Sequence, residues 1–83
     1  MGMDSPRMGG RLTVAITPSD VGRRVSIRRV LPGGRLGDVV GILEAWSDGV
    51  LRVRRRDDSL VKVAQAALVA GKIVPPAPPP RRR

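Results

Sequence analysis

Short runs of alternating apolar and polar residues constrain the fold of this chain more than any other feature. Turn signals separate these runs about every 8–12 residues, a spacing typical of all-β domains. Asp48-Gly49 is the strongest of these signals, because an Asp-Gly pair readily adopts the left-handed conformations of a two-residue hairpin. The predicted strands are residues 24–31, 38–46, 50–56, 59–63 and 69–74, with one turn of 3-10 helix at 64–68 before the last strand.

The alternation also assigns the two faces of each strand, since successive side chains of a strand point to opposite sides. The predicted core-facing residues include Val25, Ile27, Leu51, Val53, Val61 and Val63. Five short strands in this order predict a small SH3-like β-barrel, whose closure removes exposed sheet edges. Gly41 lies inside the run 38–46 and predicts a bulge or the sharp bend of a small barrel.

The two ends of the chain differ in composition from its centre. Residues 1–17 are expected to form a flexible segment, with an extra strand at 11–16 as an alternative, and residues 18–76 form the barrel. Residues 77–83 continue a proline run that begins at Pro75. Because proline fixes φ and removes a backbone donor, this Pro/Arg-rich tail or linker is expected to be extended. Both tails are expected to lack a folded structure.

The residue types that are missing exclude most catalytic chemistry. The chain has no Cys and no His, so it has no disulfide, no thiol nucleophile, no imidazole base and none of the usual zinc ligands. Its 83 residues provide one small domain, too small to enclose a substrate pocket. We therefore expect a non-enzymatic module without cofactor or metal. No stretch approaches the roughly 20 apolar residues of a membrane span, and a cytoplasmic location without a membrane partner is expected.

The chain is strongly basic, with 16 Lys and Arg against 7 Asp and Glu and a net charge of +9. Setting aside Arg7, Arg11 and Arg81–Arg83 among the cations, and Asp4 among the anions, leaves 11 against 6 for residues 18–76, a net charge of +5. Fourteen of the 16 cations are arginine, a bias that a high-GC bacterial genome also produces. The basicity therefore has two explanations, an anionic partner and genome composition.

The outward positions of the predicted strands collect basic side chains into a candidate binding face. The residues of this basic face are Arg24, Arg28, Arg52, Arg54, Arg56 and Lys62. Arginine binds phosphate and carboxylate groups through two parallel hydrogen bonds, and such a face is a candidate for nucleic acid. The simpler interpretation is a solvated strand face with Glu44, Asp57 and Asp58 as neutralising neighbours. Because Trp46 is the only aromatic residue available for stacking, nucleic-acid binding is expected to be weak and salt-sensitive.

Trp46 is the only aromatic residue of the chain and stands just before the turn at 47–49. It is a candidate partner anchor, because tryptophan is enriched at interface hot spots. The alternative is a structural role, in which the indole packs over the hairpin at the end of the barrel. One tryptophan cannot build the aromatic groove of a proline-peptide receptor or the cage of a methyl-lysine reader, so neither is expected.

Several turns and core positions together resemble a known family. The segments that carry the resemblance are Asp20-Val21-Gly22-Arg23-Arg24-Val25, Arg29-Val30-Leu31-Pro32-Gly33-Gly34, Asp38-Val39-Val40-Gly41, residues 46–54 and residues 66–76. They are similar to the N-terminal SH3-like domain of a group of actinobacterial GNAT-type N-acetyltransferases, which includes proteins described as histone acetyltransferases. The resemblance spans residues 18–76 and rests mostly on turn glycines and core apolar residues, which are more specific to a fold than to a function.

The resemblance implies an accessory role beside a GNAT catalytic domain, in cis or in trans. In that family a Pro/Arg-rich linker and an acetyl-CoA-binding domain follow the barrel, and the segment from Pro75 to Arg83 stands where the linker would begin. The acetyl-CoA turn of a GNAT domain has the pattern Arg/Gln-x-x-Gly-x-Gly/Ala. Arg7-Met8-Gly9-Gly10 fits only its first part, because Leu12 occupies the last position. No transferase activity is therefore carried over to this chain, and a stand-alone basic barrel that binds nucleic acid is the alternative.

Overall fold

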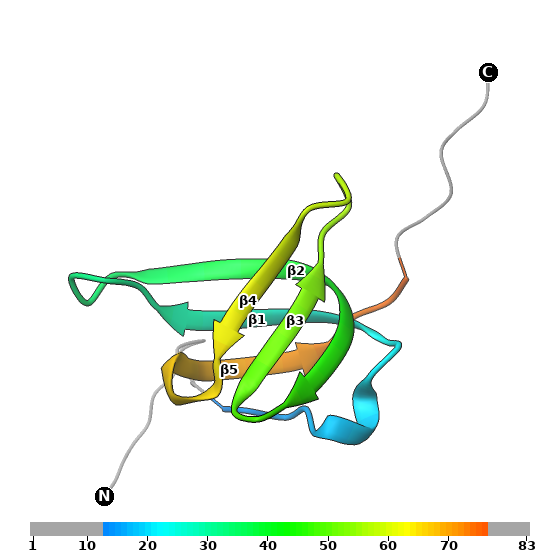
Figure 1. The fold of residues 1–83 in the computed structure, drawn as a ribbon, viewed down its shortest axis with the longest axis horizontal. Helices are drawn as coiled ribbons and strands as arrows, with labels where there is room; N and C mark the ends of the chain where they lie inside the picture. The colour runs from blue at the N-terminus through cyan, green and yellow to red at the C-terminus, as the bar shows by residue number, and fades with distance from the viewer. Residues whose placement is uncertain (1–12, 77–83) are drawn as a thin grey trace, which may run out of the picture.

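The computed structural model describes residues 13–76. Within this range the chain forms one antiparallel sheet of five strands with two short 3-10 helices and no α-helix (Figure 1). The elements are η1 (Pro18–Asp20), β1 (Arg24–Val30), β2 (Leu36–Ser47), β3 (Val50–Arg54), β4 (Leu60–Ala64), η2 (Gln65–Ala67) and β5 (Leu68–Ile73). The all-β fold and the 3-10 turn before the last strand are confirmed. The predicted tail at 77–83 and residues 1–12 of the predicted flexible segment lie outside the described range.

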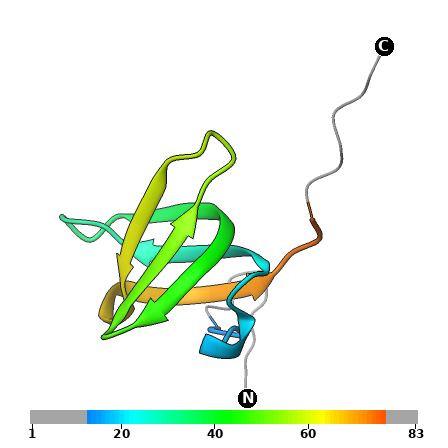
Figure 2. The ribbon, with the colours of Figure 1, turned by 45° about the vertical axis from the view of Figure 1, so that its right-hand side comes forward.

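β2 is the central strand of the sheet and carries its curvature. The strand order is β4-β3-β2-β1-β5. β2 pairs with β1 from Leu36 to Ile42 and with β3 from Ile42 to Ser47, so Ile42 belongs to both ladders. A bulge shifts the register with β3 between Leu43 and Ala45. Since each half of β2 pairs with a different neighbour, the sheet wraps around its own inner face (Figure 2).

Gly41 stands immediately before this corner, where the sequence predicted a bend. It is buried, and a Cβ at this position would collide with the carbonyl group of Arg54 on β3. The bend is therefore confirmed, but the predicted bulge is not at Gly41, because the register shifts between Leu43 and Ala45. Glycine is needed here because two backbones approach each other closely.

The two hairpins differ in length. Asp48 (φ 52°) and Gly49 (φ 75°) both adopt the left-handed conformation, as predicted for the two-residue turn between β2 and β3. The turn between β3 and β4 is longer than the predicted Asp57-Asp58 pair. β3 ends at Arg54, and the backbone N–H of Arg55 donates to the Ser59 carbonyl at 2.8 Å, which leaves a three-residue loop with Asp58 at φ 75°.

The apolar sides of the strands face one another and form a single core. The buried hydrophobic residues are Ile16, Val25, Ile27, Val39, Leu43, Leu51, Val53 and Val63. The inward faces predicted from alternation are thus correct, with the exception that Val61 is only half-buried. Lys62 and the arginines of β3 lie on the opposite, outer side of these strands.

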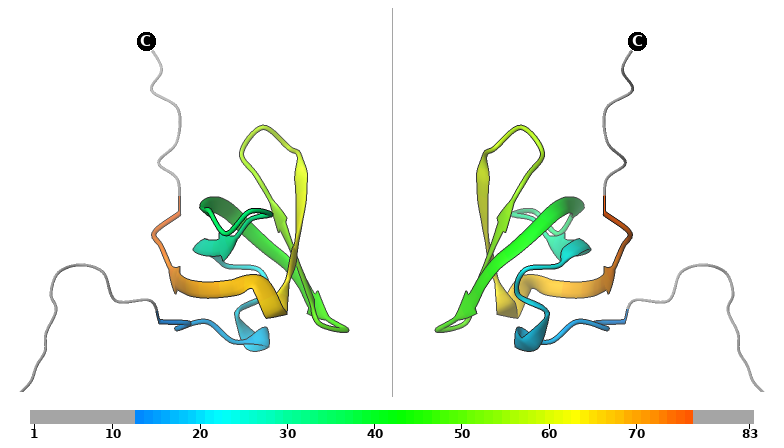
Figure 3. Two further views of the ribbon diagram at one scale, coloured as in Figure 1. Left: turned by 90° about the vertical axis from the view of Figure 1, so that its left-hand side faces the viewer. Right: turned by 90° about the vertical axis from the view of Figure 1, so that its right-hand side faces the viewer.

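The segment before η1 belongs to the folded unit. The barrel was expected to start at residue 18, so this expectation placed its start too late in the chain. Val14 forms an isolated parallel bridge with Gly71 of β5, and Ile16 is 4% exposed in the core. Two backbone hydrogen bonds fix the contact, from Ala15 N–H to the Gly71 carbonyl at 2.8 Å and from Gly71 N–H to the Thr13 carbonyl at 3.0 Å. Figure 3 shows this segment beside β5. Within the described part of 11–16 it makes one bridge and no strand.

After this segment the chain forms a capped 3-10 helix, η1. The Thr17 hydroxyl accepts a hydrogen bond from the Ser19 N–H at 3.2 Å, and the Asp20 carboxylate accepts one from the Thr17 N–H at 2.9 Å. This reciprocal arrangement satisfies backbone donors at the start of η1. Among residues 13–76, no helix is long and apolar enough to cross a bilayer.

Candidate functional site

The outward cations fall into two groups because β2 separates β1 from β3. Alternation does bring Arg24 and Arg28 to the outer face of β1, and it brings Arg52, Arg54 and Lys62 to the outer face of β3 and β4. The outer positions of β2 between the two groups carry acidic and aliphatic side chains: Asp38, Val40, Ile42 and Glu44. The predicted basic face is therefore not one continuous stripe.

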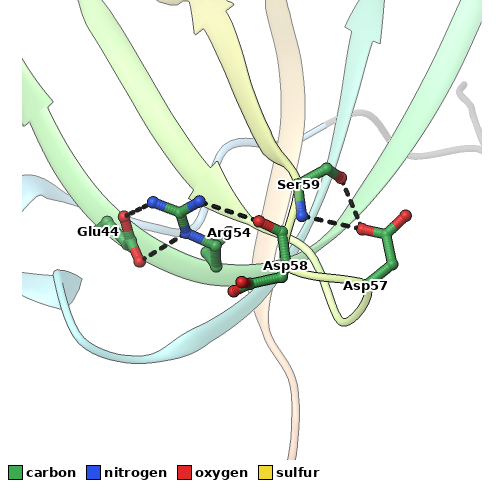
Figure 4. A network of polar contacts seen from close by, with 5 residues as sticks. All are labelled: Glu44, Arg54, Asp57, Asp58 and Ser59. Atoms are coloured by element: carbon green, nitrogen blue, oxygen red, sulfur yellow. Dashed lines mark hydrogen bonds and ion pairs between the residues drawn. The ribbon is translucent and has the colours of Figure 1, made fainter.

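Two of the predicted cations are neutralised by cross-strand carboxylates. Arg28 donates two hydrogen bonds to Asp38, from Nε at 2.8 Å and from Nη2 at 3.1 Å. Arg54 holds Glu44 in the same way, at 3.1 and 3.2 Å, and its Nη1 donates to the carbonyl of Asp58 at 2.9 Å (Figure 4). The side-chain hydrogen bonds from these arginines lower the pKa of Asp38 and of Glu44. Each of these arginines therefore shares its charge with a carboxylate of β2.

Arg52 and Lys62 remain without an anion among the described residues. They are directly opposite each other on β3 and β4, and both side chains point outward. No salt bridge or side-chain hydrogen bond involving either residue occurs between residues 13 and 76. Like charges in directly opposite positions destabilise a sheet. This pair is therefore a part of the predicted basic face that no described carboxylate neutralises.

Arg24 and Arg56 lie beside a shallow hollow. The hollow has a volume of about 360 Å³ and is lined by Arg24, Asp38, Val40, Arg55, Arg56 and Asp57. Arg24 also holds the end of β5, because its Nη1 donates to the Pro75 carbonyl at 2.8 Å and its own carbonyl accepts from the Val74 N–H at 3.0 Å. Arg56 lies in the loop between β3 and β4, outside the strand in which it was predicted.

The loop between β3 and β4 is held by its own side chains. The Asp57 carboxylate accepts hydrogen bonds from the Ser59 hydroxyl at 2.6 Å and from the Ser59 N–H at 3.0 Å (Figure 4). The hydroxyl bond is the main cause that lowers the pKa of Asp57, and the charge of nearby Arg55 lowers it further. The loop thus presents Arg55 and Arg56 from a braced backbone.

Trp46 packs partly into the barrel. It is half-buried against the core, and its indole Nε1–H donates to the Gln65 side-chain oxygen at 2.9 Å. This bond ties the end of β2 to η2. The contacts are those of the structural alternative, and a role for Trp46 as a partner anchor stays a prediction.

Sequence reasoning missed an aliphatic surface on the outer side of β2, with further exposed aliphatic residues on β1 and β4. Leu36, Val40 and Ile42 of β2 are 48%, 39% and 39% exposed, and Val30 on β1 and Leu60 on β4 are similarly exposed. In the printed sequence the run Val39-Val40-Gly41-Ile42-Leu43 is almost continuously apolar, which hides its period of two. The flanking Asp38 and Glu44 were the available signal, because they share the parity of Val40 and Ile42.

Comparison with known proteins identifies the domain. No curated protein and no solved structure matches this chain significantly. The model of one family, described as the Rv0428c N-terminal Sm-like domain, matches residues 19–72, which cover η1 and all five strands except Pro18 at the start of η1 and Ile73 at the end of β5. An Sm-like domain is a small β-barrel, in agreement with the fold described above. The chain belongs to the Rv0428c N-terminal Sm-like domain family.

Proposed function

We propose that this domain is a non-catalytic interaction module that binds a GNAT-type acetyltransferase domain, joined to it or separate from it. The observation that carries the proposal is the exposed aliphatic surface on β2. β2 is the central strand of the sheet, and its outer residues Leu36, Val40 and Ile42 are 48%, 39% and 39% exposed. Exposed apolar side chains gathered on one face mark protein contact sites more often than isolated ones do.

The polar groups of the described residues support a binding role over a catalytic one. The closest carboxylate–cation pairs are cross-strand ion pairs with exposed side chains on both partners. The serines have no imidazole to activate them, because the chain has no His. The name of the matched family, which describes an N-terminal domain, fits a module that works beside another domain.

The path of the chain end supports docking on this face. The Arg24 side chain fixes Pro75, and Arg24 is directly opposite Ile42 of β2. A domain joined beyond residue 83 would therefore be tethered to a point of the chain that lies near the aliphatic surface. A covalent tether makes docking effectively intramolecular, which raises the local concentration of the partner.

The test is a binding measurement with a GNAT catalytic domain from the same genome, by isothermal titration calorimetry. The Val40→Ser/Ile42→Ser variant should lose at least about tenfold in affinity, which corresponds to about 1.4 kcal/mol. Val21→Ser is the matched control, because Val21 is 46% exposed but lies at the end of η1, outside the β2 surface. Binding that both variants leave unchanged, or no binding by the unaltered domain, would refute the proposal.

Nucleic acid is the second candidate, and it is favoured by the Arg52–Lys62 couple, which forms no ion pair with a residue between 13 and 76. Two neutralised phosphates predict that log affinity for duplex DNA falls against log salt with a slope of about −1.8. We expect Arg52→Ser/Lys62→Ser to remove this salt dependence in a fluorescence-anisotropy assay with a labelled oligonucleotide. Arg28→Ser should change the slope little, because Asp38 already neutralises that cation. Affinity that does not change with salt would exclude this candidate.

A further inference from the structure

The hollow beside the β3–β4 loop lies where β3 separates from β2. The β2–β3 ladder ends at the pair Ile42 and Arg54, and beyond it the hairpin of β3 and β4 stands away from the first half of β2 (Figure 2). The space between them is the hollow lined by Arg24, Asp38, Val40, Arg55, Arg56 and Asp57. It therefore combines outer-face side chains of β1 and β2 with the tip of the hairpin.

The charges around the hollow favour a negatively charged group. Both carboxylates already have donors, Asp38 from Arg28 and Asp57 from Ser59. Arg24 donates only to a neutral carbonyl in the described part of the chain. No ion pair between residues 13 and 76 involves Arg55 or Arg56. The hollow is thus lined by three guanidinium groups and by two carboxylates that are already bonded.

The first half of β2 also offers unpaired backbone groups beside the hollow. The Leu43 N–H donates to the Arg23 carbonyl, on the β1 side of β2. Because bonded positions alternate along an antiparallel ladder, the backbone groups of Asp38 and Val40 point away from β1. On that side no described strand pairs with residues 36–41. Such an edge accepts an extended segment through main-chain hydrogen bonds.

From these observations we propose that the hollow binds one acidic side chain of an extended, acidic and aliphatic segment of a partner protein. Arg55, Arg56 and Arg24 bind the carboxylate of the partner's acidic residue. The aliphatic residues next to it in the partner segment pack on Val40 and Ile42. Arginine suits this role, because its planar guanidinium matches a carboxylate in a two-point geometry. The inference rests on the proposed function in one respect, since it gives the chemistry of the segment that contacts the β2 surface.

Two features make a protein segment a better occupant than nucleic acid. The hollow contains no aromatic side chain on which a base could stack, and bases of single strands bind largely by stacking. Asp38 and Asp57 are tolerable beside a single carboxylate but repel a continuous row of phosphates. The Arg52–Lys62 couple lies on β3 and β4, outside the lining of the hollow, so the two surfaces are separable by mutation.

The experiment uses the full 83-residue chain and three labelled peptides of equal length, with alternating Val-Glu, Val-Ser and Val-Lys sequences. We expect the Val-Glu peptide to bind at least tenfold more tightly than the other two in fluorescence anisotropy. In ¹⁵N NMR spectra it should shift the amide signals of Val40, Arg55 and Arg56. Arg55→Ser/Arg56→Ser should weaken binding at least tenfold, whereas Arg52→Ser/Lys62→Ser, which removes the same charge, should leave it unchanged.

Several outcomes would overturn the inference. Equal losses in the two double variants would mean that net charge alone attracts the peptide. Equal binding of the Val-Ser peptide would exclude a carboxylate site, and displacement of the Val-Glu peptide from the hollow by a single-stranded oligonucleotide would assign the hollow to nucleic acid. NMR spectra of the free variants that match the spectrum of the unaltered domain away from the substituted positions verify that the variants fold. If a GNAT domain binds the β2 surface while the Val-Glu peptide does not bind, the inference fails and the proposed function stands. If the peptide binds the hollow while the GNAT domain does not bind, the proposed function fails and the acidic-segment site stands.

Discussion

Replacing Gly41 by alanine tests the close approach of β2 and β3 at the corner of the sheet. A Cβ at this position would lie inside van der Waals distance of the Arg54 carbonyl oxygen, 2.8 Å from its carbonyl carbon and 3.0 Å from Val53 Cγ1. The main obstacle is backbone that is fixed in the β3–β4 hairpin, so it cannot rotate away as a side chain can. The whole hairpin would have to move, and with it the packing of Val53 in the core.

The magnitude follows from the cost of inserting a methyl group into a packed interior. Overpacking commonly costs about 1–3 kcal/mol, and a backbone obstacle places Gly41→Ala at or above about 3 kcal/mol. A domain of about 60 ordered residues has roughly 3–9 kcal/mol of stability in total, at roughly 0.05–0.15 kcal/mol per residue. The variant should therefore be marginally folded. Urea unfolding followed by Trp46 fluorescence measures this loss, because the half-buried indole becomes exposed on unfolding.

Gly37→Ala is the matched control in the same strand. Its Cβ would come within 2.8 Å of Leu31 Cδ1, the end of a flexible side chain that can move aside. The alanine also restricts the unfolded chain, which stabilises a protein by about 0.4–1 kcal/mol where the backbone tolerates it. We expect a change below about 1 kcal/mol in either direction. If the two variants unfold at the same urea concentration, the close approach of β2 and β3 at Gly41 does not determine stability and this reasoning is wrong.

Two further predictions concern the N-terminal segment and the surface carboxylates. Ile16→Ala should destabilise the fold by about 2–5 kcal/mol in the same urea assay, because the Ile16 side chain is 4% exposed. Val14→Ala, at a position that is 44% exposed, should cost less than about 1 kcal/mol. Equal effects of the two variants would mean that the segment does not pack on the barrel. Acid should also destabilise the domain, because the pKa values of Asp38, Glu44 and Asp57 are lowered in the folded state. Their contribution is present above the ordinary values of 3.8 for Asp and 4.5 for Glu and is lost as the pH falls through the lowered values. The urea midpoint should fall on acidification in this range, and a midpoint that stays constant would contradict the role of these carboxylates.

The β2–β3 hairpin and the inner faces were predictable because their determinants are local. Asp48-Gly49 favours its turn through the left-handed preferences of these two residues. Leu51 and Val53 fall on one face through the period of two, in whichever sheet the strand takes part. Neither property depends on which strand is the neighbour.

The three-residue loop between β3 and β4 was harder to predict, although it is also local. Two aspartates at 57 and 58 favour a turn, but the length of the loop follows from the Arg55–Ser59 backbone bond and from the two bonds that Ser59 gives to Asp57. A strand reading extends β3 to Arg56 because arginine has no strong preference against a strand. The hydrogen bonds of Asp57 with Ser59 stabilise the three-residue loop, and they form only after the chain has turned.

Alternation determined on which face of each strand its basic side chains lie, and strand order determined which side chains of the neighbouring strand lie beside them. Arg28 and Arg54 were both predicted to point outward, and they do. Whether they are available to a partner depends on Asp38 and Glu44, which lie opposite or diagonal to them only because β2 is placed between β1 and β3. Opposite charges therefore cancel at these two arginines, while Arg52 and Lys62 are brought together with no anion beside them among residues 13–76.

The sequence by itself determined the strand pattern, most of the inward residues and the tight turn at Asp48-Gly49, since these depend on φ preferences and on a period of two along one chain. Only the tertiary structure decided that Ile16 completes the core, that Val40 and Ile42 are left uncovered, and that the hairpin tip forms a hollow with Arg24. The physical reason is that these features arise between segments far apart in the chain. The identity of a residue does not specify which strand will lie beside it. Burial, charge pairing and cavities are therefore properties of the assembled sheet.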